Sequence, residues 1–112
     1  MSKTIYCIAQ FTPKQGMFDE LFDRLKSLEP KTRAEKGCIS YILTKHVKTP
    51  FATGESMPIV FNESWDSIES FEKHCQTDDI VEFFETECID TSGMVKSYNV
   101  ATYIDEQHKK EL

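Results

Sequence analysis

The sequence predicts an α+β domain of the ferredoxin-like type, with a four-stranded antiparallel sheet that carries helices on one face. Two observations lead to this class. The chain has 112 residues, enough for one hydrophobic core but not for two domains and a linker, so residues 1–112 are expected to form a single domain. Its apolar patterns follow in the order strand, helix, strand, strand, helix, helix, strand. That order is the split βαβ arrangement.

The first strand and the first helix are predicted from a change in apolar period. Residues 4–11 are rich in β-branched and aromatic side chains, and they end before Pro13, which lacks the N–H that a sheet requires. Over residues 18–28 the apolar side chains recur at the spacing of one helix face. Pro30 predicts a kink or a restart in this helix, and Gly37 is its expected end.

Two middle strands are predicted over residues 38–46 and 59–65, where β-branched and aromatic residues are again enriched. The segment between them, 47–58, holds two prolines and one glycine and is predicted to be a long loop. Such a loop either closes over a site as a lid or is tolerated on the surface.

The last part of the chain is predicted to contain two helices and a final strand. Asp66 is expected to cap the first helix, with Glu69 three residues later in the capping-box relation. Thr77 is expected to cap the second helix, which ends by 92–93, and residues 95–104 form the last strand.

The aromatic content predicts how the open face of the sheet is covered. The chain has eight Phe, four Tyr and one Trp, which is many large rings for one small domain. Helices on one face leave the other face bare, and a bare face rich in Tyr and Phe would expose a large apolar patch. The expected solution is a homodimer in which two sheets pack against each other.

Charge and motif content exclude several function classes. Thirteen basic against nineteen acidic residues give a net charge of −6, and the longest basic run is Lys109-Lys110, which argues against nucleic acid and anionic membrane as partners. The apolar stretch near the start is too short for a signal peptide or a membrane span, so a cytoplasmic protein is expected. Scattered glycines, cysteines and histidines, including His46 and His108, predict no nucleotide cofactor and no metal site.

One carboxylate and one imidazole stand out as candidate functional groups. Side chains alternate along a strand, so Phe61, Glu63 and Trp65 share one face, which places a carboxylate between two aromatic rings. His74 lies beside the apolar stripe of the following helix. A structural role for either residue, as a hydrogen-bonding group that ties strand to helix, remains open at this point.

Two segments resemble the antibiotic biosynthesis and quinol monooxygenase family. Residues 61–74 resemble its strand with the pattern E-x-W that runs into a helix ending in His, and residues 35–41 resemble its E-x-G-C turn followed by Tyr. The resemblance extends over about residues 4–104 and implies a dimeric α/β barrel. Some members of this family oxidise quinols or anthrone-like aromatics with O₂ and no cofactor, one branch isomerises a phosphorylated sugar, another degrades haem, and many have no known activity.

The sequence also departs from the family pattern. Asp79 stands where a second His is common, so mechanisms that require two imidazoles are not favoured. Ala9 and Phe84 align best with the Asn and His expected of the haem-degrading branch, which makes haem degradation disfavoured.

The resemblance implies a role for each candidate residue. His74 would be the base that deprotonates a phenol or enol, and Glu63 would orient its ring. The residues expected to contact a small aromatic or hydrophobic substrate are Trp65, Phe61, Tyr41 and Phe84. The function predicted first is cofactor-independent oxidation of a quinol or anthrone-like substrate. The alternatives are a non-catalytic barrel that binds a hydrophobic ligand and an isomerase of a hydroxy-ketone sugar phosphate, which two Arg in the chain make weaker.

Overall fold

The computed structural model describes residues 3–105 and confirms the predicted order of elements. His108 and Lys109-Lys110 lie outside the described residues. The elements are β1 (Ile5–Pro13), α1 (Phe18–Lys26), α2 (Glu29–Arg33), β2 (Cys38–Lys45), β3 (Ile59–Trp65), α3 (Ile68–Cys75), α4 (Asp78–Phe83), the π-helix η1 (Phe84–Ile89) and β4 (Val95–Ile104). None of the helices within residues 3–105 has the length and apolar run that a membrane crossing needs.

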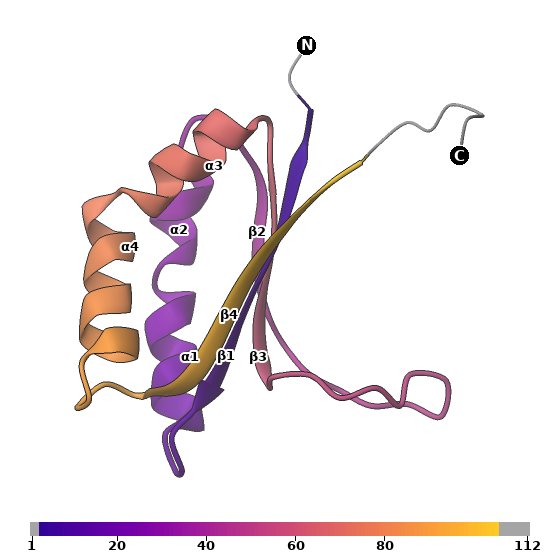
Figure 1. Cartoon of the computed structure of the whole chain (residues 1–112), viewed down its shortest axis with the longest axis vertical. Helices are drawn as coiled ribbons and strands as arrows, with labels where there is room; N and C mark the ends of the chain where they lie inside the picture. The colour runs from indigo at the N-terminus through magenta and orange to yellow at the C-terminus, as the bar shows by residue number, and fades with distance from the viewer. Residues whose placement is uncertain (1–2, 106–112) are drawn as a thin grey trace.

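The strands form one antiparallel sheet in the order β2-β3-β1-β4, and the helices lie on one of its faces (Figure 1). This is the predicted ferredoxin-like fold. The register aligns Glu63 of β3 with Cys7 of β1 on one side and Tyr41 of β2 on the other. Because directly opposed residues point to the same face of a sheet, these three side chains all face the helices.

The core lies between the sheet and the helices and follows the predicted alternation. Its largest fully buried side chains come from every second residue of β1 and β3, from the inner stripe of α1 and from α4; they are Cys7, Phe11, Leu21, Leu25, Ile59, Phe61, Trp65 and Phe83. Burial of such side chains is the main stabilising term of a domain of this size.

Several element boundaries differ from the prediction for local reasons. The first strand continues to Pro13, because a register shift after Thr12 places the proline at the end of the pairing with β4, where its missing N–H costs little. The helix restarts at Glu29 beside Pro30, as predicted. The cap of α3 is Ser67 rather than Asp66, since the Ser67 hydroxyl accepts the Ser70 N–H.

The last predicted helix consists of two parts. An α-helix that Thr77 precedes ends at Phe83, and the chain continues as a π-helix from Phe84. The wider turn of a π-helix is rare and is often found at functional sites.

The loop between β2 and β3 extends away from the sheet on the side opposite the helices (Figure 1). A short bridge between Thr49 and Ala52 forms its tip, where Phe51 is fully exposed. The same bare side of the sheet carries exposed Tyr6, Ile42 and Tyr103. The loop and this apolar face therefore lie on one side of the domain.

The outer edge of β2 is closed by side chains of α2. Glu29 accepts the Leu43 N–H at 2.8 Å, and the Arg33 side chain donates to the Tyr41 carbonyl at 3.0 Å. Glu29 is buried and also pairs with Lys26 at 2.8 Å. These contacts occupy two backbone groups of the β2 edge and so hinder its pairing with another chain.

Replacing Glu29 by Ala is expected to destabilise the fold by about 1 to 3 kcal/mol, because the Leu43 N–H loses its acceptor and the ion pair with the exposed Lys26 is lost. Urea unfolding measures the change. Glu20→Ala, at an exposed position of α1, is the matched control and should cost less than about 0.5 kcal/mol. An equal, small effect of both substitutions would contradict a role of Glu29 at this edge.

Candidate active site

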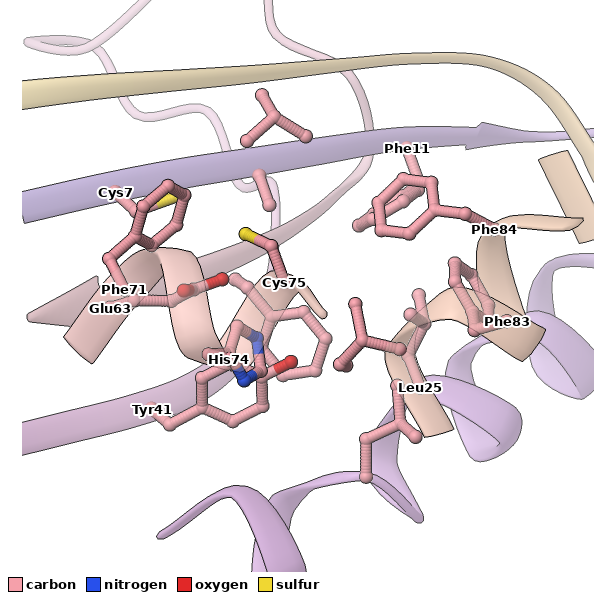
Figure 2. A pocket seen from close by; sticks show the side chains of 15 residues that line it. Cys7, Phe11, Leu25, Tyr41, Glu63, Phe71, His74, Cys75, Phe83 and Phe84 are labelled. Carbon is pink, nitrogen blue, oxygen red and sulfur yellow. The ribbon is translucent and has the colours of Figure 1, made fainter. Parts of the chain in front are cut away.

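A small cavity of about 40 Å³ lies between the sheet and the helices. All four strands and α1, α3, α4 and η1 contribute to its wall, which contains no Lys or Arg among the described residues. Figure 2 shows that its polar side chains gather at one end, where Tyr41, Glu63 and His74 meet, while Phe83 and Phe84 close the other end. Val100 of β4 also lines the cavity and is 42% exposed. The site therefore has an apolar body and one polar end.

Glu63 is a buried carboxyl in the middle of the sheet. It is 6% exposed, and the Trp65 indole N–H donates to its Oε1 at 3.0 Å. Burial raises the pKa of Glu63 to about 7, and hydrogen bonds from Trp65 and Cys7 limit the increase. At neutral pH this carboxyl is thus present in both its acid and its base form, which is the property of a general acid or base.

His74 lies in the last turn of α3 and is held by two aromatic rings. Its ring is tilted over Trp65 with centroids 4.6 Å apart and meets Tyr41 edge-on at 5.3 Å. Burial lowers the pKa of His74, and Glu35 opposes that change. The imidazole is consequently neutral at pH 7 and able to accept a proton.

The carboxylate beside His74 is Glu35 rather than Glu63. Both Glu35 oxygens lie 3.2 Å from His74 Nδ1. The sequence predicted that Glu63 would orient this ring, but the hydrogen bond of Glu63 goes to Trp65, its neighbour on the same face of β3. The signal that could have identified Glu35 is its place two residues before Gly37, in the turn that packs against α3.

Five of the six predicted site residues line the cavity together: Phe61, Tyr41, Phe84, Glu63 and His74. Tyr41 and Phe61 are stacked with ring centroids 4.2 Å apart. Trp65 is not part of the wall; its buried ring packs against His74, which is. Direct contact between Trp65 and a ligand in the cavity is therefore not supported. Trp65 acts on the site by donating a hydrogen bond to Glu63 and by packing against the His74 ring.

Four further cavity residues were not among the predicted site residues, although the apolar pattern of their elements predicts that they are buried. They are Phe71, Phe83 and the thiols Cys7 and Cys75. Burial raises the pKa of both thiols, to about 11 for Cys75, so they stay protonated at neutral pH and are poor nucleophiles. Across residues 3–105, no three His, Cys, Asp or Glu side chains are grouped as ligands of a metal ion would be.

Comparison with known proteins agrees with this fold. The family model described as antibiotic biosynthesis monooxygenase matches residues 4–86. The crystal structure of SO0527 from Shewanella oneidensis is similar with a TM-score of 0.75 and 31% identity over 94% of this chain and 93% of that chain. PA3566 from Pseudomonas aeruginosa has a TM-score of 0.76 and 21% identity over 96% and 98% of the two chains. No curated protein matches the chain significantly.

Replacing Glu63 by Gln is expected to remove a pH-dependent loss of stability. The folded-state pKa of about 7 lies above the ordinary value of 4.5, so the unfolded chain releases this proton first as pH rises, and the free energy of unfolding falls across that window. At pH 8 the Glu63→Gln protein should be more stable than the wild type by up to about 3 kcal/mol, and the gain should be absent at pH 4.

Urea unfolding of both proteins at the two pH values measures this difference. Glu69→Gln, at an exposed position of α3, is the control and should show no such pH dependence. A Glu63→Gln protein that differs from the wild type by the same amount at both pH values would contradict the raised pKa.

Proposed function

The chain belongs to the antibiotic biosynthesis monooxygenase family, and we propose that it is a cofactor-independent monooxygenase that oxidises a small quinol or anthrone-like aromatic with O₂. The observation that carries the proposal is the form of the cavity, in which aromatic walls enclose a space with acid–base groups at one end. A flat substrate with one hydroxyl or enol group would place its ring between Phe61 and the far end formed by Phe83 and Phe84, and these side chains would have to move apart because the cavity of about 40 Å³ is smaller than such a ring. Its polar group would then lie beside Glu63 and His74.

His74 is the base in this proposal. Its Nδ1 faces Glu35, so Nε2 is the nitrogen that remains for a ligand. Removal of the substrate proton gives an electron-rich anion, which can pass an electron to O₂. The dry, apolar wall favours this step because it excludes the water that would otherwise stabilise the anion and quench reactive intermediates.

Glu63 is the second acid–base group of the proposed reaction. With a pKa of about 7 it can donate a hydrogen bond to the substrate oxygen in its acid form. For an anthrone, one oxygen atom of O₂ becomes the new carbonyl and the other leaves as water, and the two hydrogens of the oxidised CH₂ group end in that water. The proton accepted by His74 is therefore returned within one turnover, and no external reductant is needed.

The two alternatives fit the cavity less completely. An isomerase of a hydroxy-ketone sugar phosphate could use the same acid–base pair, but a phosphate requires cationic side chains, and the described wall offers no Lys or Arg. A non-catalytic binding protein would need the apolar walls but not the opposite pKa shifts of Glu63 and His74. Catalytic acids and bases require pKa values shifted toward the working pH, and such shifts cluster at functional sites.

We further propose that the functional unit is a homodimer formed through the bare face of the sheet. Tyr6 and Tyr103 are opposed on this face, Ile42 lies on the same side, and all three are exposed in the single chain. The loop between β2 and β3, with Phe51 at its tip, extends on this side too, where it would contact a second copy. Covering these side chains gives the energetic reason for association.

The oxidation is tested by oxygen consumption with 1,4-naphthoquinol and anthrone as probes. The wild-type rate should exceed the uncatalysed rate, and His74→Ala and Glu63→Ala should each reduce kcat/KM by about 100-fold or more. His46→Ala is the matched control, because His46 lies outside the cavity and its ring is 3.2 Å from the Gly54 carbonyl, on the loop between β2 and β3. Turnover that persists in the His74→Ala protein would refute the role of His74, and binding without oxygen uptake would favour the non-catalytic alternative.

Light scattering tests the dimer. The wild type should have twice the chain mass of 13.0 kDa at micromolar concentration. Ile42→Asp should shift the mass toward that of one chain, because a charge on the bare face cannot be buried unpaired. Ile68→Asp, which alters an exposed isoleucine on the helix side, should leave the dimer intact. A wild-type mass of one chain would exclude the proposed dimer.

A further inference from the structure

His74 and Glu35 together span the wall between the cavity and a separate groove on the surface. His74 lines the cavity, whereas Glu35 lines the groove, and the two spaces share no residue. The groove lies between α2 and the connection from α3 to α4, and its other wall residues are Lys31, Thr32, Gln76, Thr77, Asp78 and Asp79. The His74 side chain is 5% exposed and that of Glu35 23%. The pair therefore connects a buried cavity to a solvent-exposed groove.

The contact has the geometry of a base and its orienting group. Both Glu35 oxygens lie 3.2 Å from Nδ1, so the carboxylate accepts the proton on this nitrogen. Trp65 and Tyr41 hold the ring on two sides, which limits its rotation. With Nδ1 occupied, Nε2 is the nitrogen that remains for the cavity.

The turn that carries Glu35 is fixed by its packing against the start of α3. Gly37 has a φ of +90°, and a Cβ there would lie 2.2 Å from the Ser70 hydroxyl oxygen, so the turn can approach α3 this closely only with glycine. The Gly37 carbonyl also accepts the Asp66 N–H at 2.8 Å. Glu35 is thus held by a rigid connection between two elements and not by a free surface loop.

We infer that Glu35 is a positioning residue of the proposed site, which keeps His74 in the tautomer with the proton on Nδ1 and the acceptor Nε2 toward the cavity. When Nε2 takes a substrate proton, the imidazolium stands against the Glu35 carboxylate and is stabilised by it. No proton has to leave the site, because Nε2 returns the same proton later in the turnover. This inference rests on the proposed function for its purpose but not for its test.

The other titratable groups around His74 do not take this position. Tyr41 of β2 meets the ring edge-on and stays protonated, because burial raises its pKa strongly. Glu63 of β3 is engaged by Trp65. The charged and titratable groups on the neighbouring elements are Glu69, Glu72, Lys73 and Cys75 of α3, Asp78, Asp79 and Glu82 of α4, and Glu29, Lys31 and Arg33 of α2. Glu35 alone among the described carboxylates contacts the imidazole.

The tautomer and the titration of His74 are measured directly by two-bond ¹H–¹⁵N correlation NMR on the resting protein. Loss of the corresponding signals in His46→Gln and His108→Gln assigns the remaining histidine. In the wild type, Nδ1 should be protonated and Nε2 should be the bare nitrogen at pH 7. Glu35→Gln keeps an acceptor but removes the charge, so the tautomer should persist and the pH of titration should fall by about one unit or more.

Glu35→Ala removes the acceptor as well, and His74 should then show both tautomers or the opposite one. Asp79→Asn is the matched control. The Asp79 carboxylate lines the same groove, pairs with Lys31 at 3.1 Å and does not contact His74. The tautomer and titration of His74 in this variant should match the wild type. If both Glu35 variants also match the wild type, Glu35 does not position His74 and the inference is overturned.

Oxygen consumption with 1,4-naphthoquinol then separates this inference from the proposed function. Glu35→Gln should lower kcat more than it raises KM and should move the acid limb of the pH profile to lower pH. It should keep part of the wild-type activity, whereas Glu35→Ala should lose it. If the NMR results are as expected but neither the wild type nor any variant consumes oxygen, the positioning role is supported and the proposed oxidation is refuted. If oxygen is consumed equally in all of them, the positioning role fails and the oxidation stands.

Discussion

The burial of one carboxyl group in the middle of the sheet is the constraint on which the site depends. Alternation along β3 directs Glu63 to the same face as Phe61 and Trp65, and therefore into the core. A carboxylate in such a place loses the solvation by water, which raises its pKa and makes its charged form costly. The indole N–H of Trp65 returns part of that loss. The result is a carboxyl group that exchanges its proton near neutral pH. Its burial lowers the stability of the fold, and the packing of the surrounding aromatic core offsets that loss.

Strand alternation is also why much of this structure could be predicted from the sequence. The strands, the one-sided helices and the common face of Phe61 and Glu63 all follow from the periods of apolar residues, because burial enforces those periods. Element ends were less predictable. Pro13 stays in the sheet through a register shift, and Ser67 rather than Asp66 caps α3, since both depend on contacts with residues remote in the sequence or on one backbone angle.

The partner of His74 could not be predicted in the same way. Glu35 and His74 are 39 residues apart, and they meet because the turn at Gly37 packs on the start of α3. No periodicity encodes such a contact, whereas Glu63 was an obvious choice because it is close in sequence. Phe83 and Phe84 pose a related case: adjacent residues of a regular helix rarely face one cavity, and here the change from α-helix to π-helix occurs between them.

The two faces of the sheet have different proposed roles: one lines the cavity and the other forms the dimer interface. Odd-numbered residues of β1 and β3, such as Cys7 and Glu63, face the helices and the cavity, while even-numbered ones, such as Tyr6, face the bare side. A substitution on the bare side is thus separated from the cavity by the thickness of the backbone and alters association without direct contact with the acid–base groups. Effects on stability, on assembly and on proton transfer can therefore be assigned to different residues of the same strands, which is what makes each proposal separately testable.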